Sequence, residues 1–467
     1  MIELTLREVA EMAGGVLDSV ADPERRVTGG VVIDSRDVRP GDLFVAISGE
    51  RVDGHDYGTA AVRDGAVAVL AERPVGAPAI VVADSVKGLG ALSRAVLARL
   101  TGVTVVGLTG SAGKTSTKDL LAQVLARRGA TVAPVGSFNN EIGLPLTALR
   151  ATPETEYLVL EMGARGKGHI AYLTSLTPPR VGAVLNIGTA HIGEFGGRDQ
   201  TAVAKGELVE ALPAASKGGL AVLNEDDPLV RAMADRTAAK VLTFGLGEAA
   251  DVRARDVTED HGRSSFTLVA DGELAPVHLD LIGAHHVPNA LAAAAVAHGL
   301  GMNVADIAEA LTSARRRSPG RMEILGAPDD VTVVNDAYNA NPDSVEAAYR
   351  AVMAMAGDRR RVLVLGEMAE LGEESLIEHE KAGHAAIRAG FAMVVGFGGD
   401  HARAVLAGAR AAADELGVTP ELERVQNIPG AVRLLGERLQ PRDVVLVKAS
   451  KSIGLQVLAR ELAGVKG

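Results

Sequence analysis

Short apolar runs alternate with longer amphipathic stretches along the chain, and their order divides it into three blocks. Runs bounded by glycine, proline or polar residues predict strands, whereas apolar positions three or four residues apart predict helices. The first block, residues 1–100, is predicted as a small α/β domain. Its elements are a helix over 6–12 that stops at Gly14-Gly15, strands over 31–33 and 43–47 with a turn at Pro40-Gly41, strands over 67–71 and 80–82, and a helix over 86–100.

The second block, residues 101–317, alternates strands with helices, which implies a parallel sheet covered on both faces. Its elements are strands over 103–108, 158–162 and 181–187, helices over 114–128 and 288–299, and a strand-like stretch over 254–281 with a turn at 270–272. The third block, residues 318–467, predicts a smaller doubly wound sheet without a phosphate loop. Its strands are expected over 331–334, 361–365, 393–395 and 444–447.

The expected fold class is therefore α/β, in three domains. A small N-terminal α/β domain (1–100) is followed by a central P-loop parallel-sheet ATPase domain (101–317) and a C-terminal Rossmann-like domain (318–467). A chain of 467 residues agrees with this division at about 150 residues per domain.

Composition removes several classes of function. The formal net charge of -11 argues against nucleic acid or an anionic membrane as the main partner. The absence of cysteine excludes disulfides, thiolate metal sites and cysteine nucleophiles. The N-terminus lacks an apolar signal core, and no segment approaches the ~18 uninterrupted apolar residues of a membrane span. We therefore expect a monomeric cytoplasmic protein that neither binds nucleic acid nor inserts into a membrane.

A glycine-rich loop between a predicted strand and a predicted helix indicates a nucleotide site. Its residues are Thr109, Gly110, Ser111, Ala112, Gly113, Lys114, Thr115 and Ser116. Backbone N–H groups and the helix N-terminus favour phosphate, Lys114 can reach the β- and γ-phosphates, and the Thr115 hydroxyl can hold Mg²⁺. The alternative is a tight strand–helix turn with an incidental lysine. The spacing Gly-x-x-Gly-Lys-Thr is shorter than the common pattern, which points away from GTPases and ordinary kinases.

Three further residues follow later strands and helices of the same block. Glu161 ends a strand, at the edge of a parallel sheet that faces the ligand, and its carboxylate suits Mg²⁺. His191 follows the next predicted strand, and Lys205 lies on the helix after it. Each has a plainer interpretation, as a satisfied strand-end acid, a structural histidine and a surface lysine.

Five stretches together resemble the Mur ligase family of peptidoglycan synthesis. They are the loop 109–115, Asn-Asn-Glu-Ile-Gly-Leu-Pro at 139–145, Glu-Met-Gly-Ala at 161–164, Asp-Ala-Tyr-Asn-Ala-Asn-Pro-Asp-Ser at 336–344 and Leu-Gly-Glu-Met-Ala-Glu-Leu-Gly at 365–372. The resemblance covers all three blocks, and the last four stretches are similar to motifs of the member that adds D-alanyl-D-alanine. It implies an ATP-dependent ligase that joins this dipeptide to UDP-N-acetylmuramoyl-tripeptide through an acyl phosphate.

The resemblance also implies roles for individual residues. Substrate contacts fall on Ser35, Arg36, Asn139, Asn140, Tyr338 and Asn339, and further ATP contacts on Asn289, Arg321 and Asp336. Two Mg²⁺ ions are expected on Thr115, Glu161, His191 and Lys205, with Lys205 carbamylated so that its amine becomes a carboxylate-like ligand. Lys114, Glu161, His191 and Lys205 form the expected catalytic set. From the residues alone, Arg36 suits either a diphosphate or a structural ion pair.

The chain departs from the family pattern at several positions. His286 stands where asparagine is usual, Asn335 replaces an aspartate, and Lys448-Ala449-Ser450-Lys451 replaces a Lys-Gly-Ser-Arg pattern. Lys451 keeps a positive charge but lacks the two-pronged geometry of arginine.

Two other hypotheses remain at this stage. One is a ligase of the same superfamily that adds a single amino acid, such as the diaminopimelate-adding enzyme or a folylpolyglutamate synthase. The Asp-Asn-Pro-Arg-like motif typical of the diaminopimelate enzyme is missing from the third block. The other is a P-loop nucleotide switch protein, which would not need Glu161, His191 and Lys205.

Overall fold

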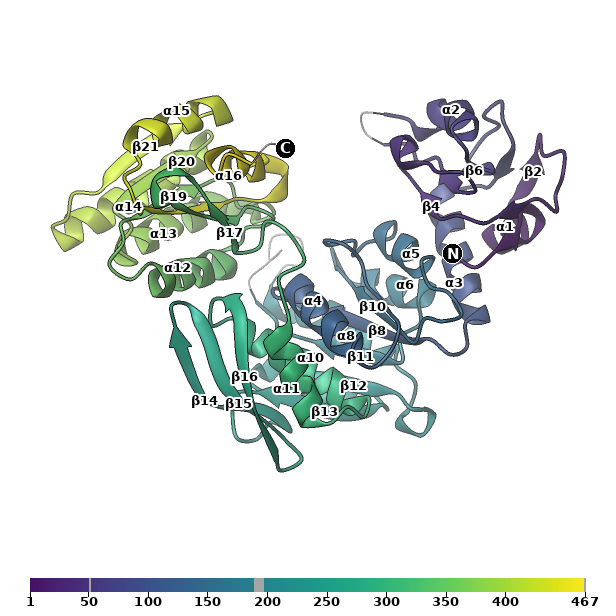
Figure 1. Ribbon diagram of the computed structural model, residues 1–467, viewed down its shortest axis with the longest axis horizontal. Helices are drawn as coiled ribbons and strands as arrows, with labels where there is room; N and C mark the ends of the chain where they lie inside the picture. The colour runs from purple at the N-terminus through teal and green to yellow at the C-terminus, as the bar shows by residue number, and fades with distance from the viewer. Residues whose placement is uncertain (50–51, 189–196, 466–467) are drawn as a thin grey trace.

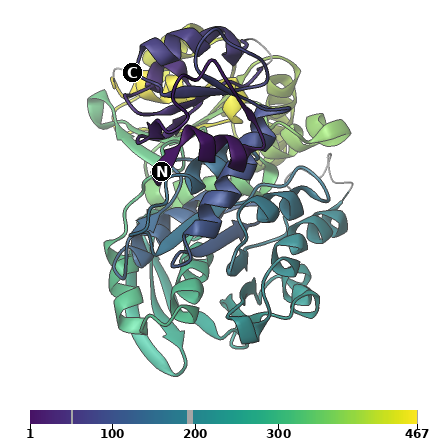
Figure 2. The ribbon, with the colours of Figure 1, turned by 90° about the vertical axis from the view of Figure 1, so that its right-hand side faces the viewer.

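The computed structural model describes residues 1–49, 52–188 and 197–465, which form three lobes, each built on its own main sheet. Figures 1 and 2 show the N-terminal and C-terminal lobes on the same side of the central lobe. The predicted α/β class and order of lobes are confirmed. Among the described residues, no helix is both long and apolar enough to cross a membrane.

The N-terminal lobe carries a mixed sheet in the order β2-β7-β6-β5-β4 and a separate pair, β1 with β3. Its strands and helices are β1 (Leu4–Thr5), α1 (Leu6–Ala13), β2 (Val16–Asp18), β3 (Arg26–Val27), β4 (Val31–Val32), β5 (Leu43–Val45), α2 (Gly58–Arg63), β6 (Ala68–Ala71), β7 (Ala79–Val81) and α3 (Ser85–Arg99). Thr5 and Glu8 cap the start of α1 reciprocally, and Gly14 ends it with a φ of 69°. Strands β4 and β5 pair in parallel, so Pro40-Gly41 belongs to a crossover.

The central lobe is built on a long mixed sheet in the order β16-β15-β14-β13-β12-β11-β8-β10-β9, and β9 to β14 in it are parallel. Its strands are β8 (Thr104–Thr109), β9 (Thr131–Val132), β10 (Tyr157–Glu161), β11 (Val181–Val184), β12 (Leu220–Asn224), β13 (Lys240–Gly245), β14 (Val252–Asp260), β15 (Arg263–Ala270) and β16 (Glu273–Ile282). Its helices are α4 (Lys114–Leu125), α5 (Gly143–Ala148), α6 (His169–Leu176), α8 (Arg198–Glu210), α9 (Pro228–Arg231), α10 (His286–Gly299) and α11 (Val304–Ser313).

The strand-like stretch over 254–281 forms an antiparallel extension of this sheet. Two turns divide it, at His261-Gly262 and at Asp271-Gly272, and all four residues have positive φ. Two-residue turns of this kind match the twist of paired strands. The sequence predicted the second turn, whereas the first was not predicted.

Helix α10 forms the centre of the largest core in the central lobe. Its alanine-rich stretch from Ala290 to Ala297 is fully buried. Small side chains allow α10 to lie close to α4 and the sheet. The helix that follows the glycine-rich loop is therefore held on a rigid support.

The C-terminal lobe contains a sheet in the order β17-β18-β22-β19-β20-β21, in which β17 is the antiparallel edge strand. Its strands are β17 (Glu323–Gly326), β18 (Thr332–Asp336), β19 (Arg361–Leu365), β20 (Met393–Phe397), β21 (Glu421–Val425) and β22 (Val444–Lys448). Its helices are α12 (Pro342–Ala356), α13 (Ser375–Arg388), α14 (Asp400–Leu416), α15 (Ile428–Arg438) and α16 (Gln456–Leu462). The four predicted strands are confirmed as β18, β19, β20 and β22.

The segment that leads from α11 to the C-terminal lobe is bound to α4. Gln123 contacts the backbone of Arg315 twice, donating to its carbonyl at 2.9 Å and accepting from its N–H at 3.0 Å. Asp119 accepts a hydrogen bond from the N–H of Ser318 at 3.0 Å. The connection between α11 and the C-terminal lobe is therefore anchored to α4, the helix that carries Lys114.

Candidate functional site

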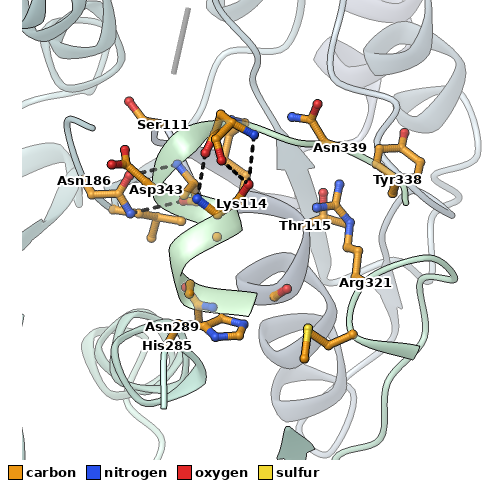
Figure 3. Close-up of a pocket in the computed structure, with 18 of the residues that line it drawn as sticks. Ser111, Lys114, Thr115, Asn186, His285, Asn289, Arg321, Tyr338, Asn339 and Asp343 are labelled. Atoms are coloured by element: carbon orange, nitrogen blue, oxygen red, sulfur yellow. Dashed lines mark hydrogen bonds between the residues drawn. The ribbon is translucent and has the colours of Figure 1, made fainter. Parts of the chain in front are cut away.

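A cavity of 420 Å³ lies between the central and C-terminal lobes, and both contribute to its walls. The central lobe supplies the glycine-rich loop and the ends of β10 and β11, and the C-terminal lobe supplies residues just before β17 and residues after β18 and β19. In Figure 3, Arg321, Tyr338 and Asn339 lie across from Lys114 and Thr115. The cavity therefore opens at the carboxyl ends of parallel strands, where α/β proteins place their ligands.

The glycine-rich loop is shaped by contacts from strand ends and from α10. Gly113 has a φ of 79°, and a Cβ at this position would lie 2.3 Å from Oδ1 of Asn289, so only glycine fits. Asn186 holds Ala112 with both ends of its amide, at 2.9 and 3.2 Å. Nζ of Lys114 donates to the carbonyl of Gly110 at 2.7 Å. Residues 111 to 116 line the cavity, as expected of a phosphate-binding loop.

The sequence predicts Thr109 as an ATP contact, but the structure places it outside the cavity lining. It is fully buried, and its hydroxyl donates to the carbonyl of Met162 at 2.9 Å. This bond ties the end of β8 to the residue after β10, because the two strands are neighbours in the sheet. Thr109 therefore anchors the start of the loop to the sheet, while the rest of the loop from Ser111 on lines the cavity.

Glu161 collects hydroxyl and amide donors at the back of the cavity. Thr115 donates to its Oε2 at 2.7 Å, while Ser137 and Asn139 donate to Oε1 at 2.9 and 2.8 Å. Burial raises the pKa of Glu161, but the charges of Lys114 and Arg321 and these hydrogen bonds outweigh it, so its pKa lies below the ordinary value. Thr115 and Glu161 thus present oxygen atoms side by side, which suits Mg²⁺.

Lys205 lies on α8 with 2% of its surface exposed. Burial lowers the pKa of its amine well below the ordinary value, and the nearby charge of Lys114 lowers it further. Lys205 is therefore a buried residue, and its interpretation as a surface lysine is wrong. His191 lies outside the described residues. Within those residues no cluster of three or more acidic or histidine side chains forms a metal site.

The wall from the C-terminal lobe holds the other expected ATP and substrate residues. Asp336 accepts from Lys448 and, at 3.0 Å, from the N–H of Met322. Lys448 also donates to the carbonyl of Asn339 at 3.0 Å. The guanidinium of Arg321 lies 4.4 Å from the centre of the Tyr338 ring. These contacts order the wall that faces Lys114.

Like Thr109, the expected residues Gly110, Lys205, Ser35, Arg36 and Asn140 are not part of the cavity lining. Ser35 and Arg36 belong to a short 3₁₀ turn of the N-terminal lobe, where Arg36 is paired with Asp34 and lowers the pKa of that carboxyl to about 2. The ion pair that the sequence left open is therefore present. Asn140 accepts from the N–H of Gly143 at 2.9 Å, at the start of α5.

Sequence reasoning did not single out Ser137, Asn186 or Asp343. Ser137 and Asn186 contact Glu161 and Ala112, which are distant along the chain. Asn186 follows β11, and this position at a strand end was the available signal. Asp343 was quoted only within a motif; it lies in the first turn of α12 and lines the cavity.

The partly buried His285 and the buried His286, at the start of α10, predict a loss of stability in acid. The rings of His285 and His286 lie 4.2 Å apart, and burial lowers the pKa of His285 to about 4 and that of His286 well below its ordinary value. Below pH ~6.5 the unfolded chain takes up protons that the folded chain does not, so the free energy of unfolding falls. Between pH 7.5 and 5.5, we expect the free energy of unfolding to fall less in His286→Asn than in the wild type, as measured by urea titration. Equal losses in both proteins would contradict this explanation.

Comparisons with known proteins agree with this geometry. Three family models match successive parts of the chain: "Mur ligase family, catalytic domain" matches residues 28–100, "Mur ligase middle domain" 108–297 and "Mur ligase, glutamate ligase domain" 320–451. The UDP-N-acetylmuramoyl-tripeptide–D-alanyl-D-alanine ligase of Mycobacterium tuberculosis is 46% identical, covering 99% of this chain and 98% of its own.

Two solved structures are similar over most of the chain. MurF from Acinetobacter baumannii has a TM-score of 0.87 and 30% identity, with 99% of each chain covered. MurF ligase from Thermotoga maritima in complex with ADP has a TM-score of 0.78 and 31% identity, covering 94% of this chain and 98% of its own. The arrangement of all three lobes is therefore shared with these proteins.

Proposed function

Because the chain belongs to the Mur ligase family, we propose that it joins D-alanyl-D-alanine to UDP-N-acetylmuramoyl-tripeptide at the expense of ATP. One observation supports this most directly: a phosphate-binding loop and a buried acid face a wall of the C-terminal lobe across a single cavity. That arrangement can hold ATP beside a carboxylate and admit an amine. We propose that the chain acts as a monomer in the cytoplasm, and that residues 1–100, 101–317 and 318–467 bind the UDP end, ATP and the amine respectively.

The first proposed step activates the substrate carboxylate. A carboxylate oxygen attacks the γ-phosphorus of ATP, and the bond from this phosphorus to the oxygen of the β-phosphate breaks. The products of this step are ADP and an acyl phosphate. This step brings two anions together, and Lys114 and the N-terminus of α4 offset their repulsion. No side chain of this chain has to form a covalent bond.

Thr115 and Glu161 fit a magnesium ion, because both present oxygen atoms beside the loop. Bound there, Mg²⁺ would neutralise phosphate charge. We propose that Lys205 and His191 complete a two-ion site, with Lys205 carbamylated. The burial of Lys205 and its lowered pKa support this role, because only a neutral amine can react with CO₂.

The second proposed step forms the amide. The amino group of the dipeptide attacks the acyl carbon, and the tetrahedral intermediate collapses with release of phosphate. Walls from two lobes line the cavity, and their approach around bound substrates would limit the access of water to the acyl phosphate. We propose that Asp336 binds the ribose hydroxyls and that Arg321 and Asn289 make further ATP contacts. Asn139, Asn140, Tyr338 and Asn339 are proposed to contact substrate in the closed enzyme, and Ser35 and Arg36 to contact the nucleotide sugar.

A coupled assay of ADP release tests this function. With UDP-muramoyl-tripeptide and D-alanyl-D-alanine together, we expect turnover of about 10 s⁻¹, the median for enzymes, and at least about 100-fold above that with either substrate alone, because sustained ADP release needs both. UDP-muramoyl-dipeptide with diaminopimelate serves as the control pair. Turnover confined to the control pair would identify a single-amino-acid ligase, and ADP release independent of both substrates would indicate a nucleotide switch.

A further inference from the structure

We propose that Glu370 receives the ammonium group of the incoming amine and takes the proton that this group must lose before it attacks. The inference rests on the proposed function and assigns a role to a residue of the 365–372 stretch. Glu370 follows β19 and lines the cavity from the C-terminal lobe. It is exposed there, and its negative charge acts on the amine of Lys114 in the facing loop. Glu370 therefore lies on the cavity wall that faces the phosphate-binding loop, close enough for its charge to act on Lys114.

The loop that carries Glu370 is fixed on its N-terminal side. The N–H of Met368 donates to Nε2 of the buried His379 at 2.8 Å, and the N–H of Ala369 donates to Oγ of Ser450 at 2.9 Å. The N–H of Ser450 in turn donates to the carbonyl of Glu367 at 2.9 Å. Two consecutive residues before Glu370 are therefore held by side chains from α13 and from the segment after β22.

The backbone of Glu370 has a φ of 67°, in the left-handed region that glycine adopts readily. A glutamate there costs of order 1 kcal/mol, and such costs persist where the surrounding structure enforces them. Glycine would fill this position with less strain. The side chain therefore needs an explanation other than stability, and its place in the cavity provides one.

The described lining of the cavity contains three other carboxylates, and each is less exposed than Glu370. Glu161 accepts from three side chains, and Asp336 is paired with Lys448. Asp343 lies against the end of the β11 segment, with Oδ2 2.5 Å from where a Cβ of Gly188 would be. Of the four, Glu370 alone is exposed in the described structure. It is therefore the carboxylate best placed to meet a cation that arrives from solvent.

The chemistry needs such a group. At neutral pH the dipeptide carries an ammonium, which has no lone pair. Transfer of one proton to the Glu370 carboxylate frees the lone pair, and nitrogen then bonds to the acyl carbon. As the intermediate collapses, the C–O bond to phosphate breaks, and the phosphate leaves with that electron pair. It carries away the second nitrogen proton, and Glu370 returns the first to solvent.

Two different nucleophiles, hydroxylamine and D-alanyl-D-alanine, separate formation of the acyl phosphate from attack by the amine. Hydroxylamine, a small neutral nucleophile, traps the acyl phosphate as a hydroxamate without needing a carboxylate partner. We expect Glu370→Gln to keep hydroxamate formation and the KM for ATP within about twofold. Its kcat/KM for D-alanyl-D-alanine should fall about 100-fold, the range of a lost general base. Glu373→Gln, an exposed acid in the same segment, is the matched control and should retain both activities.

Glu370→Gly distinguishes chemistry from folding. Because glycine accepts the left-handed backbone, the thermal midpoint of this variant should equal or exceed that of the wild type. Its ligation activity should nevertheless be lost to the same extent as in Glu370→Gln. Unchanged ligation in Glu370→Gln, or an equal loss of ligation and hydroxamate, would overturn the proposal. So would a selective loss in Asp343→Asn with Glu370→Gln unaffected. A wild type that neither ligates this dipeptide nor forms hydroxamate would instead refute the proposed function.

Discussion

Replacement of Lys114 by alanine is expected to lower the rate of ADP release about 10³-fold, or about 4 kcal/mol of transition-state stabilisation. Lys114 is the first residue of α4 and lines the cavity at the phosphate-binding loop. Burial lowers the pKa of its amine below the ordinary value, and the charges of Glu161 and Glu370 offset only part of this shift, so the acids favour the charged form. Without this charge, the repulsion between the carboxylate and the phosphate is offset much less at the centre of the loop.

The control for this substitution is Lys87→Ala, on α3 of the N-terminal lobe, where the side chain is largely exposed. It should retain wild-type turnover. Thermal melts of both variants should lie close to that of the wild type, because Lys114 bonds only within its own loop among the contacts described. Turnover of Lys114→Ala within tenfold of the wild type would refute the proposed phosphoryl transfer.

Replacement of Lys205 by alanine is expected to reduce ligation at least about 100-fold, and formate or acetate should restore part of it. Lys205 is 2% exposed and feels the charge of Lys114, so the loss of its side chain leaves a buried space within range of the loop. A short carboxylate that enters this space would supply the oxygen atoms of the missing carbamate. The measurement is ligation rate against carboxylate concentration, with chloride at equal ionic strength as the control.

A second readout does not depend on activity. Wild-type protein equilibrated with ¹³C-bicarbonate should show a carbamate carbon signal by NMR, and Lys205→Ala should not. A folded variant that carboxylates fail to rescue, together with a wild type that shows no such signal, would exclude the carbamate. The buried amine would then be a positioning group for α8.

The glycine-rich loop and the position of Glu161 could be predicted because each depends on local order in the chain. A strand, a loop and a helix in succession form one unit, and a parallel strand presents its last residue at the ligand edge. β12 was not predicted although it is apolar and buried, since a short apolar run in an alanine-rich chain does not distinguish strand from helix. β21 is a polar edge strand with little hydrophobic signal.

The contacts that complete the site could not be predicted, because they join distant parts of the chain. Asn289 reaches Gly113 only after α10 has packed against α4, and Ser137 reaches Glu161 from a separate loop. Spacing within the sequence carries no information about such pairs. His379 and Ser450 likewise come from other parts of the chain to bind the two residues before Glu370.

The attachment of the segment after α11 to α4, through Gln123 and Asp119, affects how nucleotide affinity should be understood. Since the two cavity walls belong to different lobes, ATP meets its full set of contacts only in molecules whose lobes are together. The measured dissociation constant is then the intrinsic one divided by the fraction of such molecules. We therefore expect substitutions at Gln123, which does not line the cavity, to change the apparent affinity for ATP by changing the fraction of molecules whose lobes are together.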